Sequence, residues 1–148
     1  MASFSRAIDL SRVPEAVFPW LLEADRVPRW TSRLEAYEQL DDGPLRRGSR
    51  LRETLDLAGT KLSFELELTR YEPPSAAESR FTVRGVQVTN GYALEPTGAG
   101  TRLTQTLEAE AKSFSGRMLI PVMQPRLERK IAEDLDRLRE QLDQSSLS

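Results

Sequence analysis

The chain has 148 residues, 39% hydrophobic and 30% charged, and its formal net charge of −2 argues against the basic surface on which nucleic-acid-binding proteins rely. It contains no cysteine and no histidine, which excludes disulfides, thiolate nucleophiles, Ser-His-Asp catalysis and the commonest ligands of transition metals. No run approaches the roughly 18 apolar residues of a membrane span, and the first ten residues lack the apolar region of a signal peptide.

The first thirty residues predict one strand and two short helical segments. Residues 3–10 alternate loosely between apolar and polar side chains, which is typical of a strand. Residues 13–24 carry apolar side chains at helical spacing, with Pro14 suited to a first turn and Pro19 limiting the length. Residues 25–30 predict a second short turn or helix, which ends at Trp30.

Residues 34–111 predict six strands in succession. The hydrophobic period changes to two over the ranges 34–40, 49–57, 61–71, 78–85, 86–96 and 101–111. Short clusters rich in glycine, proline and aspartate separate several of these ranges. Because short connections join antiparallel neighbours, we expect an antiparallel meander.

The sequence ends in a long amphipathic helix. After residue 116 the period returns to 3.6, and one apolar stripe is formed by Leu127, Ile131, Leu135, Leu138 and Leu142. We therefore expect a single α+β domain over residues 1–143, with a seven-stranded curved antiparallel sheet, and a disordered tail over 144–148. A helix about 10 Å across is too narrow to fill the concave face of such a sheet, so a cavity is expected between them.

Polar residues interrupt the inward faces of the predicted strands at three positions, Glu53, Asn90 and Gln105. An unpaired polar group facing an apolar interior costs a few kcal/mol, so these side chains are candidates for holding the polar end of a ligand. Burial would raise the pKa of Glu53 and make it a candidate acid or base, with Tyr92 as a second candidate. The alternatives are that Glu53 reaches solvent at a bulge or pairs with an arginine, and that Tyr92 belongs to the core.

The stretch "LIPVMQP", residues 119–125, is apolar on more than one side and contains two prolines. Methionine adapts to irregular surfaces, which suits a binding wall. We expect this segment, with Met118, Val122 and Met123, to cover the cavity opposite Trp30. The alternative is that it packs as ordinary core.

Several stretches carry a resemblance to a known superfamily: "VPEAVFPWLLEADRVPRW" after the first strand, "GSRLRETL" in the third strand and "GYALEPTGAGTRLTQTLE" in the last hairpin. Together with the leucine stripe, they make the whole chain resemble the START/Bet v1-like (SRPBCC) superfamily, in its polyketide cyclase/dehydrase and lipid-transport branch. The resemblance implies a helix-grip fold whose deep hydrophobic cavity binds lipids, polyketides, quinones and similar ligands. It supplies no universal catalytic motif.

The sequence therefore predicts a cytoplasmic protein that binds a hydrophobic small molecule (lipid, polyketide or quinone-like) as a carrier or sensor. We expect no metal, no cofactor, no nucleic-acid partner, no integral membrane association, and a monomer or weak homodimer. The expected ligand-binding residues are Trp30, Glu53, Phe64, Phe81, Asn90, Tyr92, Gln105, Met118, Val122 and Met123.

Two other functions stay open at the level of the sequence. One is a polyketide cyclase or aromatase in which Glu53, Tyr92 or an arginine moves protons through water. The other is an interaction module that docks a protein partner through an exposed apolar segment, residues 118–123.

Overall fold

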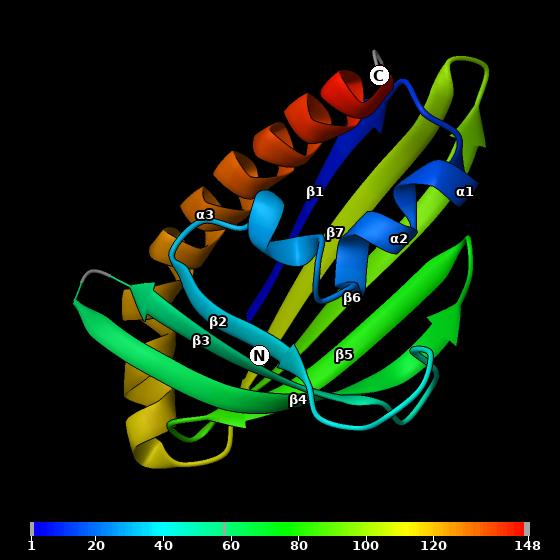
Figure 1. Cartoon of the computed structure of the whole chain (residues 1–148). Helices are drawn as coiled ribbons and strands as arrows, with labels where there is room; N and C mark the ends of the chain where they lie inside the picture. The colour runs from blue at the N-terminus through cyan, green and yellow to red at the C-terminus, as the bar shows by residue number, and fades with distance from the viewer. Residues whose placement is uncertain (1, 58, 147–148) are drawn as a thin grey trace.

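The computed structural model describes residues 2–57 and 59–146, and its elements follow the predicted order (Figure 1). Strands, two short α-helices and one long α-helix are joined by mostly short connections, and a 3-10 turn follows the second helix. The elements are β1 (Ala2–Leu10), α1 (Pro14–Val17), α2 (Pro19–Leu22), η1 (Val27–Arg29), β2 (Leu34–Gln39), β3 (Arg50–Leu57), β4 (Thr60–Glu72), β5 (Ala76–Val83), β6 (Val86–Thr97), β7 (Gly100–Ala111) and α3 (Phe114–Ser146).

All seven strands form one antiparallel sheet in the order β1-β7-β6-β5-β4-β3-β2. Strands β2 to β7 pair with their sequence neighbours, as the short connections predict. Strand β1 pairs with β7, so the first and last strands lie side by side. The seven-stranded antiparallel sheet expected from the sequence is therefore confirmed.

The sheet curves around a concave face that carries the core (Figure 1). The pairing register shifts between Leu34 and Ala36 in β2 and between Leu68 and Arg70 in β4. Such bulges bend a strand and increase its twist. Glu53, Asn90 and Gln105, which the alternation predicts to face inward, all lie on this concave face.

Helix α3 packs its leucine stripe against β1, β7 and β6. Leu135 and Leu138 are fully buried, and burial of each leucine side chain contributes about 1.5–3 kcal/mol. The connection between β1 and α1 reaches the C-terminal part of α3, where Ser11 Oγ donates a hydrogen bond of 3.1 Å to Asp143 Oδ1 (Figure 1). No helix in the described part of the chain is long and apolar enough to cross a membrane.

The long helix has a defined start. The hydroxyl oxygen of Ser113 accepts a hydrogen bond of 3.0 Å from the Gly116 N–H, which is the geometry of a serine N-cap. Pro121 and Pro125 both lie inside the helix, so the carbonyls four residues earlier lack their usual donors. The helix continues to Ser146, three residues past the predicted end of the domain. The rest of the predicted tail, residues 147 and 148, lies outside the described residues.

The first turn of α3 fits tightly against the β5–β6 turn. The N–H of Lys112 donates a hydrogen bond of 2.8 Å to the Gly85 carbonyl oxygen. A Cβ atom placed on Gly116 would lie 2.0 Å from that same oxygen, a distance at which the backbone must move. Gly116 is therefore required for the close approach of helix and turn.

Replacing Gly116 with alanine is expected to lower the free energy of unfolding by about 1–3 kcal/mol, because the clash outweighs the better helix propensity of alanine. Urea denaturation followed by circular dichroism measures the change. Gly98→Ala is the matched control, since a Cβ on Gly98 meets nothing within 4 Å. Equal stability of the two variants would contradict the tight fit.

Candidate ligand-binding cavity

The space between the concave face of the sheet and α3 holds two adjoining compartments, with volumes of about 100 Å³ and about 120 Å³. Five apolar residues from four strands and the helix line both of them: Leu55, Phe64, Phe81, Leu107 and Leu127. The rings of Phe64 and Phe81 stack with their centroids 4.0 Å apart. These shared side chains form the boundary between the compartments.

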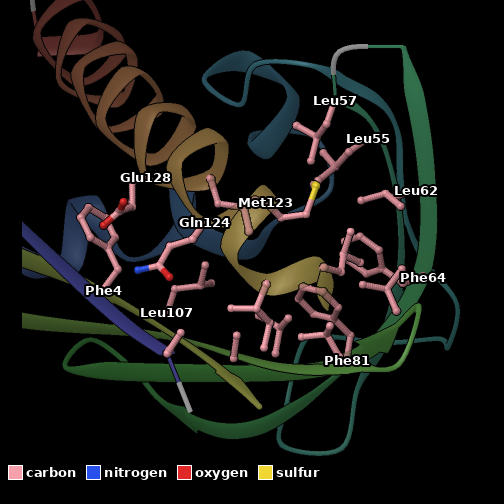
Figure 2. A pocket seen from close by; sticks show the side chains of 18 of the residues that line it. Phe4, Leu55, Leu57, Leu62, Phe64, Phe81, Leu107, Met123, Gln124 and Glu128 are labelled. Carbon is pink, nitrogen blue, oxygen red and sulfur yellow. The ribbon is translucent and has the colours of Figure 1, made fainter. Parts of the chain in front are cut away.

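The compartment nearer the start of α3 is called the apolar compartment. Figure 2 shows Met123 reaching from α3 toward Leu55 and Leu57. Among the described residues that line it, only Ser3, Gln124 and Glu128 have polar side chains. The remaining lining residues outside the shared boundary are Ala2, Phe4, Leu57, Leu62, Val83, Val86, Val88, Ala109, Leu119, Ile120 and Met123. Such a lining suits a hydrocarbon or an aromatic group.

The second compartment, called the polar compartment, gathers hydrogen-bonding groups from five strands and from α3. Apolar residues of α2, η1 and the strands close it on the remaining sides. Its polar side chains are those of Thr31, Tyr37, Glu53, Ser79, Asn90, Tyr92, Gln105, Lys130 and Asp134, and Trp30 also lines it. A few convergent polar groups in an apolar surround are typical of a small-molecule site.

Asn90, Tyr92 and Gln105 form a connected group on β6 and β7. Tyr92 and Gln105 lie directly opposite each other in the strand register. The Gln105 Nε2 atom donates to Asn90 Oδ1 at 2.9 Å and, more weakly, to the Tyr92 hydroxyl at 3.5 Å. Gln105 is only 7% exposed, and its Oε1 atom has no hydrogen-bond partner among the described residues. A free acceptor therefore lies in the wall of the compartment.

Glu53 lies in the wall of the polar compartment, and its carboxyl group has an altered pKa. Burial raises the pKa of Glu53 from 4.5 to about 7, with Lys130 lowering it and Asp134 raising it. The β3–β4 register is continuous at Glu53, so no bulge turns it to solvent there. Its neighbour Arg52 forms ion pairs with Glu38 and Glu65 on the outer face. The structure therefore contains neither of the two alternatives for Glu53, which were a bulge that turns it to solvent and an arginine partner.

The two tyrosines of the compartment remain protonated near neutral pH. Burial raises the pKa of Tyr92 above its ordinary value, and the charge of Glu53 raises it further. Burial also raises the pKa of Tyr37, again with help from Glu53. The Tyr37 hydroxyl donates a hydrogen bond of 2.8 Å to the Leu22 carbonyl oxygen. Both phenols therefore act as hydrogen-bond donors rather than as bases, and the Tyr37 proton is already taken by the Leu22 carbonyl.

The helix contributes a buried ion pair that the sequence analysis missed. Lys130 Nζ donates to Asp134 Oδ2 at 2.5 Å, and the two residues are only 9% and 4% exposed. The other carboxylate oxygen of Asp134 accepts a hydrogen bond of 2.8 Å from the Ser32 N–H. The sequence predicts the apolar stripe of this helix, but it was not used to predict any buried charged side chain there. The sequence contained one signal for this buried pair, its position along the helix. Lys130 and Asp134 directly precede Ile131 and Leu135, so both border the apolar stripe.

Seven of the ten predicted site residues meet in the polar compartment. They are Trp30, Glu53, Phe64, Phe81, Asn90, Tyr92 and Gln105, and Met123 lines the apolar compartment. Their role in ligand binding stays a prediction. Tyr37, Ser79, Lys130 and Asp134 were not predicted.

The prediction that Met118 and Val122 cover the cavity is wrong. Met118 and Val122 are 62% and 57% exposed and line neither compartment, whereas Leu119 and Ile120 line the apolar one. The helical period explains this, because one turn cannot place consecutive apolar residues all on its inner side. The segment also does not face Trp30, which lies beside the later turn that carries Lys130 and Asp134.

An antiparallel sheet that curves around a long C-terminal helix, with two short helices after its first strand, is the Bet v1-like helix-grip fold. Residues 1–143 match the family described as polyketide cyclase / dehydrase and lipid transport. The chain belongs to this family.

Solved structures share the fold at low sequence identity. The Zhui aromatase/cyclase from Streptomyces sp. R1128 is 14% identical, with a TM-score of 0.80 over 96% of this chain and 93% of that one. TTHA0849 from Thermus thermophilus is 18% identical, with a TM-score of 0.77 over 97% of both chains. Ara h 8.0201 is 11% identical, with a TM-score of 0.75 over 95% of this chain and 97% of that one. These likenesses show the fold alone, and no curated protein matches the chain.

Proposed function

We propose that the protein binds a hydrophobic small molecule, of lipid, polyketide or quinone-like kind, between the sheet and α3, as a carrier or sensor. The observation that carries this proposal is the pair of adjoining compartments, one apolar and one polar. Because the two compartments adjoin, a single molecule would place its apolar body in one and its polar end in the other. Membership of a family described as polyketide cyclase / dehydrase and lipid transport supports the same class of ligand.

The two compartments supply different parts of the binding free energy. Removing apolar ligand surface from water contributes about 25 cal/mol for each Å². In the polar compartment, a ligand donor that reaches Gln105 Oε1 would satisfy a buried acceptor whose lack of a partner costs about 1–3 kcal/mol. The apolar part would thus give affinity, and the polar end would fix orientation.

Filling the apolar compartment tests the proposal. Ala109 lines this compartment, and Ala109→Phe places a ring inside it. We expect affinity for an uncharged apolar dye such as Nile red to fall about tenfold or more, since about 1.4 kcal/mol of lost contact is a factor of ten. Fluorescence titration measures this, with circular dichroism to verify folding.

The matched control is Ala93→Phe, because Ala93 is exposed on the outer face of the same sheet. We expect it to bind the dye as the unmodified protein does. Equal dye affinity in Ala109→Phe and Ala93→Phe would count against an internal binding site.

One observation favours a second candidate function, a cyclase or aromatase. A carboxyl group with a pKa of about 7 exchanges protons readily near neutral pH, and Glu53 lies in the compartment with protonated Tyr92. In an aldol-type ring closure, Glu53 would take a proton from the carbon beside a ketone, and that carbon would bond to a second carbonyl. Glu53 would return the proton to the new alkoxide, and loss of a neighbouring proton with the hydroxyl would release one water. The product would be lighter than the substrate by the mass of one water.

A further inference from the structure

The first turns of α3 carry an apolar stripe on their solvent side that neither the core nor the cavity uses. Its members, Phe114, Met118 and Val122, are 76%, 62% and 57% exposed. They recur every four residues, so they lie on one face of the helix. Among the described residues, three of the five exposed large hydrophobic side chains belong to this outer stripe.

The same turns are also apolar on their inner side. Leu119, Ile120 and Met123 line the apolar compartment, so they have a structural reason to be hydrophobic. The outer stripe has no such reason within the residues that the structure describes. Exposed prolines, Pro121 and Pro125, extend its apolar surface along the same side of the helix.

Arginines flank the outer stripe. At 100° per residue, Arg117 projects to one side of the stripe, Arg126 to the other, and Arg129 lies about two turns beyond Val122 on the stripe's own side. All three are exposed, and none forms an ion pair within the described part of the chain. Their charges are local, because the chain as a whole has a net charge of −2.

We propose that this face of α3 docks on the surface of an anionic lipid bilayer. An apolar stripe bordered by basic side chains is the pattern of a helix that lies in the interface between headgroups and acyl chains. Phe114 and Met118 enter the acyl boundary, and the guanidinium groups contact lipid phosphates, for which their geometry is well suited. The helix lies in the plane of the surface and does not cross it.

Docking at this face places the apolar compartment next to the bilayer. The turns that carry the outer stripe are the same turns whose inner side walls that compartment. A protein held this way has only the thickness of one helix between its cavity and the lipid. The docking itself depends on surface chemistry and does not require the proposed ligand.

Vesicle flotation tests the proposal with the full chain. We expect the protein to float with vesicles of phosphatidylcholine mixed with phosphatidylglycerol and to remain behind with phosphatidylcholine alone. Added salt is expected to weaken the association, because it screens exposed charges. Failure to float with the anionic vesicles at low salt would overturn the proposal.

The apolar part of the surface is tested with Phe114→Ser/Met118→Ser. We expect affinity for anionic vesicles to fall about tenfold or more, since each exposed apolar side chain that enters the interface contributes on the order of 1 kcal/mol. The matched control is Val13→Ser/Leu40→Ser, which removes exposed hydrophobic side chains elsewhere. Equal loss in both variants, or none in the first, would overturn the proposal.

The basic part is tested with Arg117→Gln/Arg126→Gln/Arg129→Gln. Each basic residue near an anionic surface contributes about 1 kcal/mol, so we expect a loss of about a hundredfold. Arg137→Gln/Arg139→Gln, on exposed positions of later turns of the same helix, is the control.

Light scattering separates the lipid surface from another occupant. We expect the unmodified protein to have the molar mass of a monomer, and we expect Phe114→Ser/Met118→Ser to have the same oligomeric state. A stable dimer that Phe114→Ser/Met118→Ser dissociates would assign the stripe to a second copy of the chain and overturn the proposal. All variants should still bind Nile red inside the cavity, so a failure of ligand binding is distinguishable from a failure of docking.

Discussion

Asp134→Ala is expected to lower the free energy of unfolding by about 3–5 kcal/mol, because it leaves the buried Lys130 ammonium without its partner. The N–H of Ser32 loses its acceptor as well. Urea denaturation at neutral pH measures the change. A loss below about 1 kcal/mol would show that water already solvates the pair, as it does for exposed ion pairs.

The pair itself is not expected to be strongly stabilising. Desolvation of two charges offsets their attraction, so Lys130→Met/Asp134→Leu should be within about 1–2 kcal/mol of the unmodified protein, or more stable. The single and double variants together separate the cost of an unpaired charge from the contribution of the pair. If the pair serves a ligand rather than the fold, the double variant keeps its stability and loses ligand affinity.

Glu53→Gln is expected to stabilise the protein at alkaline pH. A pKa raised from 4.5 to about 7 means that the folded protein binds the carboxyl proton more tightly than the unfolded chain does. The associated stability is therefore present below about pH 4.5 and is lost as the pH rises through 7. The lost stability amounts to about 3 kcal/mol. Glutamine keeps the shape and carries no charge, so the variant should exceed the unmodified protein by about this amount at pH 8.

The measurement is the free energy of unfolding of both proteins at pH 4 and pH 8. We expect the difference between them to be small at pH 4 and largest at pH 8. Glu67→Gln, on the exposed face of β4, is the control and should show no such trend. A difference for Glu53→Gln that does not grow with pH would contradict the buried position of the carboxyl group.

The sequence was sufficient to place three polar groups of the strands, although Tyr37 of β2 and Ser79 of β5 were not predicted. Alternation in β3, β6 and β7 assigned Glu53, Asn90 and Gln105 to the concave face, because the period of two allows only two faces and leucines mark one of them. The curvature of the sheet brings Glu53 of β3 into the same compartment as Asn90 and Gln105, which alternation cannot predict for strands that are not neighbours.

The same reasoning was less reliable for α3. A helix has a continuous circumference, so a residue beside the apolar stripe can lie at its edge or within it, and Lys130 and Asp134 lie within it. In the first turns, apolar residues occur around the whole helix, and the pattern cannot tell the inner side from the outer one. Met118 and Val122 were misplaced for this reason. Cavity volume depends on the distance between helix and sheet, which no single residue determines.

The polar groups of the polar compartment lower the stability of the fold. A buried ion pair, a carboxyl group with a raised pKa and an unsatisfied amide oxygen all cost more than an apolar core of the same volume. The proposed ligand, whose polar end they would hold, would account for their convergence beside an apolar compartment.

Native mass spectrometry tests the central claim most directly, on the freshly purified protein and again after incubation with lipid, polyketide and quinone panels. The account predicts one bound molecule per chain, released by solvent extraction and absent from Ala109→Phe. A released product lighter by one water than the compound supplied would assign the cyclase function. A chain that shows only its own mass, both as purified and after every incubation, would contradict the binding function proposed for this cavity.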